Sequence, residues 1–94
     1  MKYILFWEFC PKDFDKVVER YLALGKEVEK HPDKFPKVIF NSQTMAGETK
    51  GFQVVESTSE QMTEAMIFWK GELTLKFVPI VETAKIVEKY LKSK

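Results

Sequence analysis

Aromatic and β-branched residues dominate the start of the chain. Residues 2–9, KYILFWEF, predict a strand on this basis. Pro11 and Asp13 then open a helix, because the apolar positions that follow recur with the helical period of 3.6 residues. These positions are Phe14, Val17, Val18, Tyr21, Leu22, Gly25 and Val28. The pair His31-Pro32 ends the helix, since proline disfavours helical backbone in the residue before it.

The middle of the chain predicts a hairpin. Residues 37–45, KVIFNSQTM, and residues 51–56, GFQVVE, have strand character and are joined by the turn AGETKG. Ser57 and Glu60 have the spacing of a capping box, which predicts that a second helix begins there. The apolar stripe of this helix consists of Met62, Ala65, Met66 and Trp69, and Gly71 ends it.

The last part predicts one more strand and one more helix. Residues 73–80, LTLKFVPI, form the strand, and Val81, Ala84, Val87 and Leu91 indicate the helix. The order β-α-β-β-α-β-α is the ferredoxin-like pattern, with sheet order 4-1-3-2 in one α+β domain over residues 1–94. Pro36 and Pro79 agree with this order, because proline is tolerated on edge strands.

Alternation divides this sheet into two faces. One face is wholly apolar and should pack on the helices: Tyr3, Leu5, Trp7, Phe9, Leu73, Leu75 and Phe77. The other face mixes apolar and polar residues: Ile4, Phe6, Glu8, Thr74, Lys76, Val78 and Ile80. A face in contact with water should be mostly polar, and no remaining segment is long enough to cover this one. We therefore expect a homodimer in which the open faces of two sheets meet.

The candidate site residues are the polar members of this mixed face. Glu8 and Lys76 belong to neighbouring strands, and Asn41 and Gln53 are assigned to the same face. A carboxylate desolvated between sheets has a raised pKa and can act as a general base, and an amide can orient a substrate carbonyl. The structural alternative is a Glu8–Lys76 ion pair that fixes strand register or crosses the dimer interface, and we favour it because buried charges need partners.

A second carboxylate stands at the end of the third strand. Strands 1 and 3 are expected to be parallel neighbours, which brings Glu56 near Glu8 and makes the two a candidate carboxylate pair. The simpler explanation of Glu56 is its position before a helix, where a negative charge complements the helix dipole.

The stretches WEFCP, GFQVVES and FVPIVE resemble a small family catalogued as domain of unknown function 3303. A ferredoxin-like domain with an open face also resembles the dimeric α/β-barrel superfamily. That resemblance implies a barrel made by two copies. The superfamily includes cofactor-independent monooxygenases, haem-handling enzymes, lactone isomerases and small-molecule-sensing domains. The family itself supplies no catalytic residue to carry over.

Charge and composition exclude several partners. The net charge is +1 with lysine and glutamate interleaved, so no basic patch for nucleic acid or an anionic membrane is predicted. No apolar run approaches a membrane span, and Glu8 interrupts the N-terminal apolar stretch, which argues against a signal peptide. A cytoplasmic location is expected. The only cysteine, Cys10, and the only histidine, His31, offer no metal-ligand spacing, so neither a metal nor a cofactor is predicted.

Three functional hypotheses follow. The first is a homodimer that binds an apolar or aromatic small molecule between sheet and helices. The second is a cofactor-independent oxygenase or isomerase with Glu8 as base, so whether the protein is an enzyme stays open. The third is a structural or interaction module without a ligand, in which Glu8 and Lys76 hold the dimer together.

Overall fold

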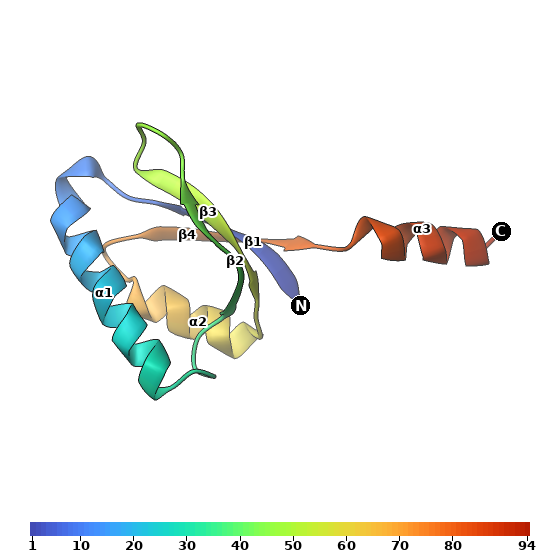
Figure 1. Cartoon of the computed structure of the whole chain (residues 1–94), viewed down its shortest axis with the longest axis horizontal. Coiled ribbons are helices and arrows are strands. Elements are labelled where there is room, and N and C mark those ends of the chain that lie inside the picture. The colour runs from blue at the N-terminus through green and yellow to red at the C-terminus, as the bar shows by residue number, and fades with distance from the viewer.

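The computed structural model describes residues 1–94 and contains one four-stranded sheet with three α-helices (Figure 1). Strands β1 (Lys2–Glu8), β2 (Lys37–Thr44), β3 (Lys50–Glu56) and β4 (Thr74–Ile80) alternate with helices α1 (Phe14–Lys30) and α2 (Ser59–Phe68). A short 3-10 turn, η1 (Pro11–Asp13), precedes α1, and α3 (Thr83–Lys92) follows β4. The predicted α+β fold is confirmed, with each predicted strand within one residue of its observed bounds.

The strand order is β2-β3-β1-β4, which is the predicted order 4-1-3-2 written from the other edge. All three neighbouring pairs are antiparallel. Pro79 lies on edge strand β4, and Pro36 directly precedes edge strand β2. Both positions agree with the rule that proline is tolerated on edge strands and not in central ones. Helices α1 and α2 lie on one side of the sheet, and the opposite side is open (Figure 1).

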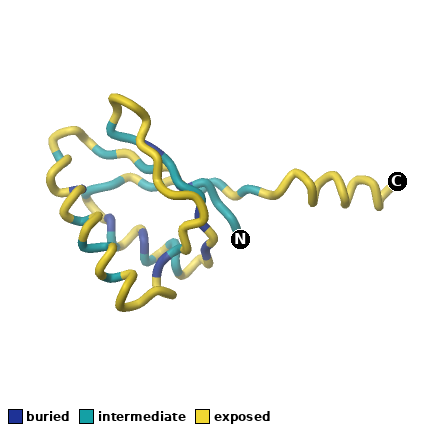
Figure 2. The backbone as a smooth tube through the Cα atoms, viewed as in Figure 1, coloured by how far each residue is buried: buried dark blue, intermediate teal, exposed yellow.

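The core lies where the sheet meets these two helices (Figure 2). Its buried apolar residues are Leu5, Val17, Phe35, Val55, Ala65 and Trp69. Val55 on β3 is fully buried, while Val54 beside it points to the open side, so alternation along the strand separates the two faces. Met66, which was predicted on the apolar stripe of α2, is exposed.

Gly51 is buried because Trp7 occupies the space above it. The two residues are direct partners of the β1–β3 ladder, and a Cβ on Gly51 would overlap the Trp7 indole and the Gln43 carbonyl oxygen. The indole Nε1 donates a hydrogen bond of 2.9 Å to Ser42 Oγ on β2. A glycine therefore lets one tryptophan bridge three strands.

Helix α2 begins one residue later than the predicted capping box. Thr58 is the N-cap, its hydroxyl accepts from the Gln61 amide at 3.1 Å, and the Gln61 side chain accepts from the Thr58 amide at 3.0 Å. The predicted box of Ser57 and Glu60 is therefore wrong. Ser57 is buried instead and donates its hydroxyl to the Thr58 carbonyl oxygen at 2.8 Å.

Helix α3 projects beyond the end of the sheet and lies in contact with neither layer (Figure 1). It gives the chain extents of 54 × 33 × 18 Å. None of its residues is buried, as the uniformly exposed colour of this helix in Figure 2 shows. No helix of the chain has the length and apolarity needed to cross a bilayer.

Candidate functional site

The open face of the sheet has an apolar centre. Direct ladder partners place the side chains of Phe40, Val54, Ile4 and Val78 in one row across β2, β3, β1 and β4. The next row contains Gln43, Phe52, Phe6 and Lys76. Phe40 and Phe52 stack with their ring centroids 6.2 Å apart and an interplanar angle of 17°. We call this set, without Gln43 and Lys76, the apolar centre.

Charged residues flank the apolar centre at both ends of the strands. At one end the row is Lys37, Glu56, Lys2 and Ile80. At the other end it is Lys50, Glu8 and Thr74. An apolar centre with a polar rim is the anatomy of protein interfaces, where the centre is desolvated and the rim stays in contact with water.

Glu8 is exposed and lies between Lys50 on β3 and Thr74 on β4. Lys76 is opposite Phe6, so Glu8 and Lys76 are diagonal neighbours on one face, as the alternation predicted. No ion pair joins either of them to another residue of the chain, and Lys50 Nζ instead lies 3.9 Å from Glu48 Oε1. A Glu8–Lys76 contact across a dimer interface stays a prediction.

The two predicted amides lie elsewhere. Gln53 is the ladder partner of Leu5, which is buried, so Gln53 faces the helices and its predicted place on the open face is wrong. Asn41 is exposed and falls in the irregular part of β2 between Phe40 and Gln43, where its carbonyl oxygen accepts from Gln43 Nε2 at 3.1 Å. Neither amide is brought beside Glu8.

Glu56 is also far from Glu8. Strands β1 and β3 are antiparallel, not parallel, so Glu56 pairs with Lys2 at one end of the ladder and Glu8 pairs with Lys50 at the other. The hypothesis of a Glu8–Glu56 carboxylate pair is therefore wrong. Sequence reasoning also missed Lys50, because it was assigned to the turn. The alternation Lys50, Phe52, Val54 within β3 was the signal that places it on the open face.

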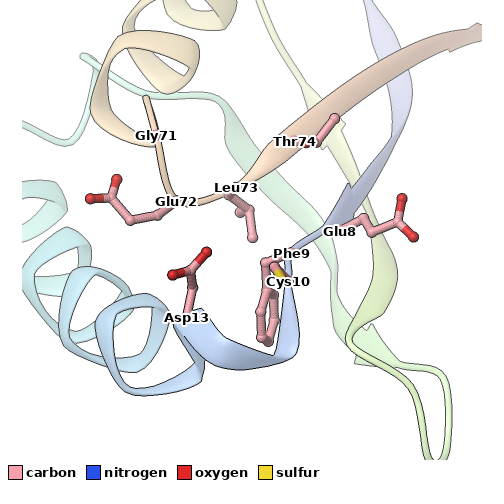
Figure 3. A pocket seen from close by; sticks show the side chains of 8 residues that line it. All are labelled: Glu8, Phe9, Cys10, Asp13, Gly71, Glu72, Leu73 and Thr74. Atoms are coloured by element: carbon pink, nitrogen blue, oxygen red, sulfur yellow. The ribbon is translucent and has the colours of Figure 1, made fainter.

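A shallow hollow of about 270 Å³ lies at the end of β1 (Figure 3). Its lining residues are Glu8, Phe9, Cys10, Asp13, Gly71, Glu72, Leu73 and Thr74. Asp13 and Glu72 lie on one side of it, whereas the Glu8 carboxylate points away on the far side of its strand (Figure 3). The acidic groups do not converge, and no cluster of three histidine, cysteine or acidic side chains in the chain is placed to hold a metal ion.

A second hollow, of about 290 Å³, lies between α1 and α2. The Arg20 guanidinium stacks 4.0 Å from the centroid of the Phe68 ring and donates to the Phe68 carbonyl oxygen, while Lys34 Nζ lies 3.9 Å from Glu64 Oε2. The only arginine of the chain thus joins α1 to the end of α2. Packing between the two helices therefore explains the position of Arg20.

Cys10 and His31 do not form a pair. Cys10 is exposed directly before η1, and His31 is exposed at the C-terminal end of α1. The 17 residues of α1 separate them, which corresponds to about 25 Å of helix. A thiol–imidazole pair is therefore not available in the chain.

The strand order and the open face make this chain a ferredoxin-like α+β protein with an added C-terminal helix. Over residues 1–94 the chain matches DUF3303, a domain of unknown function, and it belongs to that family. The family resemblance of WEFCP, GFQVVES and FVPIVE is thereby confirmed. No curated protein and no solved structure matches the chain.

Proposed function

We propose that the protein is a homodimer in which the open sheet faces of two copies pack on each other, as in a dimeric α/β barrel, and that this dimer binds an apolar or aromatic small molecule. The observation that carries the proposal is the apolar centre between two charged rims. Phe6 alone leaves 36% of its surface exposed at the middle of a central strand. Exposed apolar patches with a polar rim mark sites for a partner or a ligand.

We place the ligand at the open face rather than between sheet and helices. The helix side of the sheet carries the fully buried Val55 and the buried Leu5, so its centre is already filled. On the open side, stacked Phe40 and Phe52 offer aromatic surface, and Glu8, Lys50 and Thr74 supply polar groups at one rim. Binding sites commonly combine an apolar lining with a few polar groups that fix orientation.

Glu8 has a different role in each of the three functions. As the general base of a cofactor-independent oxygenase or isomerase, it would have to be desolvated, which in this exposed position requires the partner copy. As part of a structural module, it would only pair with Lys76 or Lys50 across the interface. Glu8→Gln keeps the shape of the side chain and removes its charge. It should leave the dimer and its melting temperature unchanged while weakening ligand binding.

Sedimentation analysis tests the dimer. The wild type should be dimeric at micromolar concentration, and Phe6→Lys should be monomeric because it places a charge in the apolar centre. Met66→Lys is the matched control, since Met66 is an exposed apolar residue on the helix side. A monomeric wild type, or a Phe6→Lys variant that dimerises like the wild type, contradicts the proposed interface.

A thermal-shift screen tests the ligand. Quinols, haem, flavins and aromatic acids are the probes, because a ligand that binds the native state raises stability by about 2.7 kcal/mol at a hundred times its dissociation constant. At least one of these classes should raise the melting temperature of the wild type. The same compound should raise the melting temperature of Glu8→Gln by a smaller amount. If no class raises it, the interaction module without a ligand replaces this proposal.

A further inference from the structure

Helix α3 has an apolar side that touches nothing. Its residues on that side are Ala84, Ile86, Val87, Tyr90 and Leu91, and the other side carries Lys85, Glu88, Lys89, Lys92 and the C-cap Ser93. All of them are exposed, with Leu91 at 61% and Val87 at 49%. A helix of ten residues is marginal in water by itself and gains its stability from packing its apolar side. This helix therefore needs a surface to pack on.

The connection to the sheet holds α3 away from its own chain. Only Val81 and Glu82 separate it from β4, and Glu82 Oε1 accepts a hydrogen bond of 3.0 Å from Lys2 Nζ on β1. This ion pair fixes the start of α3 beside the first residue of β1. From there the helix runs outward beyond the end of β4 (Figure 1).

Helix α1 carries a second uncovered apolar surface. Its inner side contributes the buried Val17 to the core. Its outer flank is exposed along the whole helix and consists of Phe14, Val18, Tyr21, Leu22 and Val28. Phe14, Val18 and Tyr21 are spaced by four and three residues and Val28 follows Tyr21 by seven, so the flank forms a stripe of the kind that receives another helix.

The amount of exposed surface indicates that a second copy covers these regions. The chain exposes 7225 Å², whereas a folded monomer of 11.0 kDa exposes about 5,600 Å². Its radius of gyration is 15.6 Å, against about 12 Å for a compact domain of this length. The excess of about 1,600 Å² is roughly twice what one partner buries in a standard interface. A standard contact between open faces would bury about 800 Å² of each copy, so about half of the excess is left for α3, which we call the arm.

The topology indicates where on the partner the arm lies. α3 follows β4 at one edge of the sheet, and α1 leads into β2 at the other edge. In a two-fold dimer whose axis runs along the strands, β4 of one copy lies beside β2 of the other, which brings α3 toward the partner's α1. Pairing of α3 with α3 is disfavoured by charge, since residues 82–94 hold four lysines and two glutamates, whereas α1 is balanced.

We infer that α3 of each copy packs its apolar side on the outer flank of α1 in the partner copy, so that two exchanged arms close the dimer. The inference rests on the proposed open-face dimer and adds the partner surface that the arm occupies. Each dimer then contains two such helix–helix contacts, and a substitution on the arm acts twice.

Paired variants test the arm by analytical ultracentrifugation of the full chain. Val87→Gln with Leu91→Gln should raise the dimer dissociation constant at least about tenfold, because each lost apolar contact occurs twice. Lys85→Gln with Lys89→Gln is the matched control on the polar side and should change it less than about twofold. An unchanged constant for the first pair in a dimeric wild type overturns the arm but leaves the open-face dimer standing. A monomeric wild type refutes both.

Disulfide trapping identifies the surface that the arm contacts. In a Cys10→Ser background, Leu91→Cys mixed with Tyr21→Cys should give a disulfide-linked heterodimer under mild oxidation. Leu91→Cys alone should not cross-link. A strong Leu91→Cys homodimer means that two arms pack on each other and overturns the assignment to α1. An internal disulfide in the Tyr21→Cys/Leu91→Cys double variant, without cross-linking of the mixed single variants, overturns it in favour of the chain's own α1.

Discussion

Lys2 and Glu82 join the first strand to the start of the last helix. Lys2 Nζ lies 3.0 Å from Glu82 Oε1, although 80 residues separate the two along the chain. The hydrogen bond, and then the Coulombic attraction, lower the pKa of Glu82 below its ordinary value of 4.5 and raise the pKa of Lys2 above 10.5. Both side chains are about half exposed, so the ion pair orients α3 more than it stabilises the fold.

The first prediction concerns the pH dependence of this ion pair. The lowered pKa of Glu82 gives stability that is present above pH 4.5 and is lost as pH falls through the folded-state pKa. The raised pKa of Lys2 gives stability that is present below pH 10.5 and is lost at higher pH. The melting temperature of the wild type should therefore exceed that of Glu82→Gln between these values and converge with it outside them.

Salt is the control for that experiment. At 1 M NaCl the Debye length falls to about 3 Å, so the difference between wild type and Glu82→Gln at pH 7 should shrink. A difference that is independent of both pH and salt would mean that Glu82 acts through something other than its charge.

The second prediction separates the observed cap of α2 from the one expected from spacing. Thr58→Ala removes the hydroxyl that accepts from the Gln61 amide and should lower the free energy of unfolding by about 1 kcal/mol. Glu60→Gln alters the residue that the spacing had favoured and should change it by less than about 0.5 kcal/mol. Urea unfolding of the two variants compares them, and a larger loss for Glu60→Gln would contradict the observed cap.

The third prediction compares two glycines. Gly51→Ala should lower the free energy of unfolding by about 3 kcal/mol or more, because the new methyl group meets the Trp7 ring and the backbone of Gln43. Gly25→Ala adds its methyl group to a helix with nothing within 4 Å and should raise stability by about 0.5–1 kcal/mol. Thermal unfolding at one protein concentration measures both, and Gly51→Ala should also alter the Trp7 fluorescence.

Periodicity was enough to predict the order of elements, the strand order and the two faces of β1 and β4. It placed Glu8 and Lys76 correctly because regular strands alternate without interruption. It failed for Gln53, whose parity depends on where the hairpin turn ends, and for Glu56, whose position depends on strand direction. Periodicity also could not predict that α3 stands apart from the rest of the chain. An amphipathic pattern predicts that a helix has an apolar side, but it does not say which chain covers that side.

The last prediction separates the two faces of one strand. Val55 is fully buried against the helices, so Val55→Ala should lower the free energy of unfolding by about 2 kcal/mol at any protein concentration. The neighbouring Val54 lies on the open face, within the apolar centre, so the same valine-to-alanine substitution can be made there. Val54→Ala should cost little in a dilute monomer and should instead raise the dimer dissociation constant. Urea unfolding and sedimentation of both variants measure the two effects, and equal losses of stability in dilute solution would mean that the open face is covered within one chain.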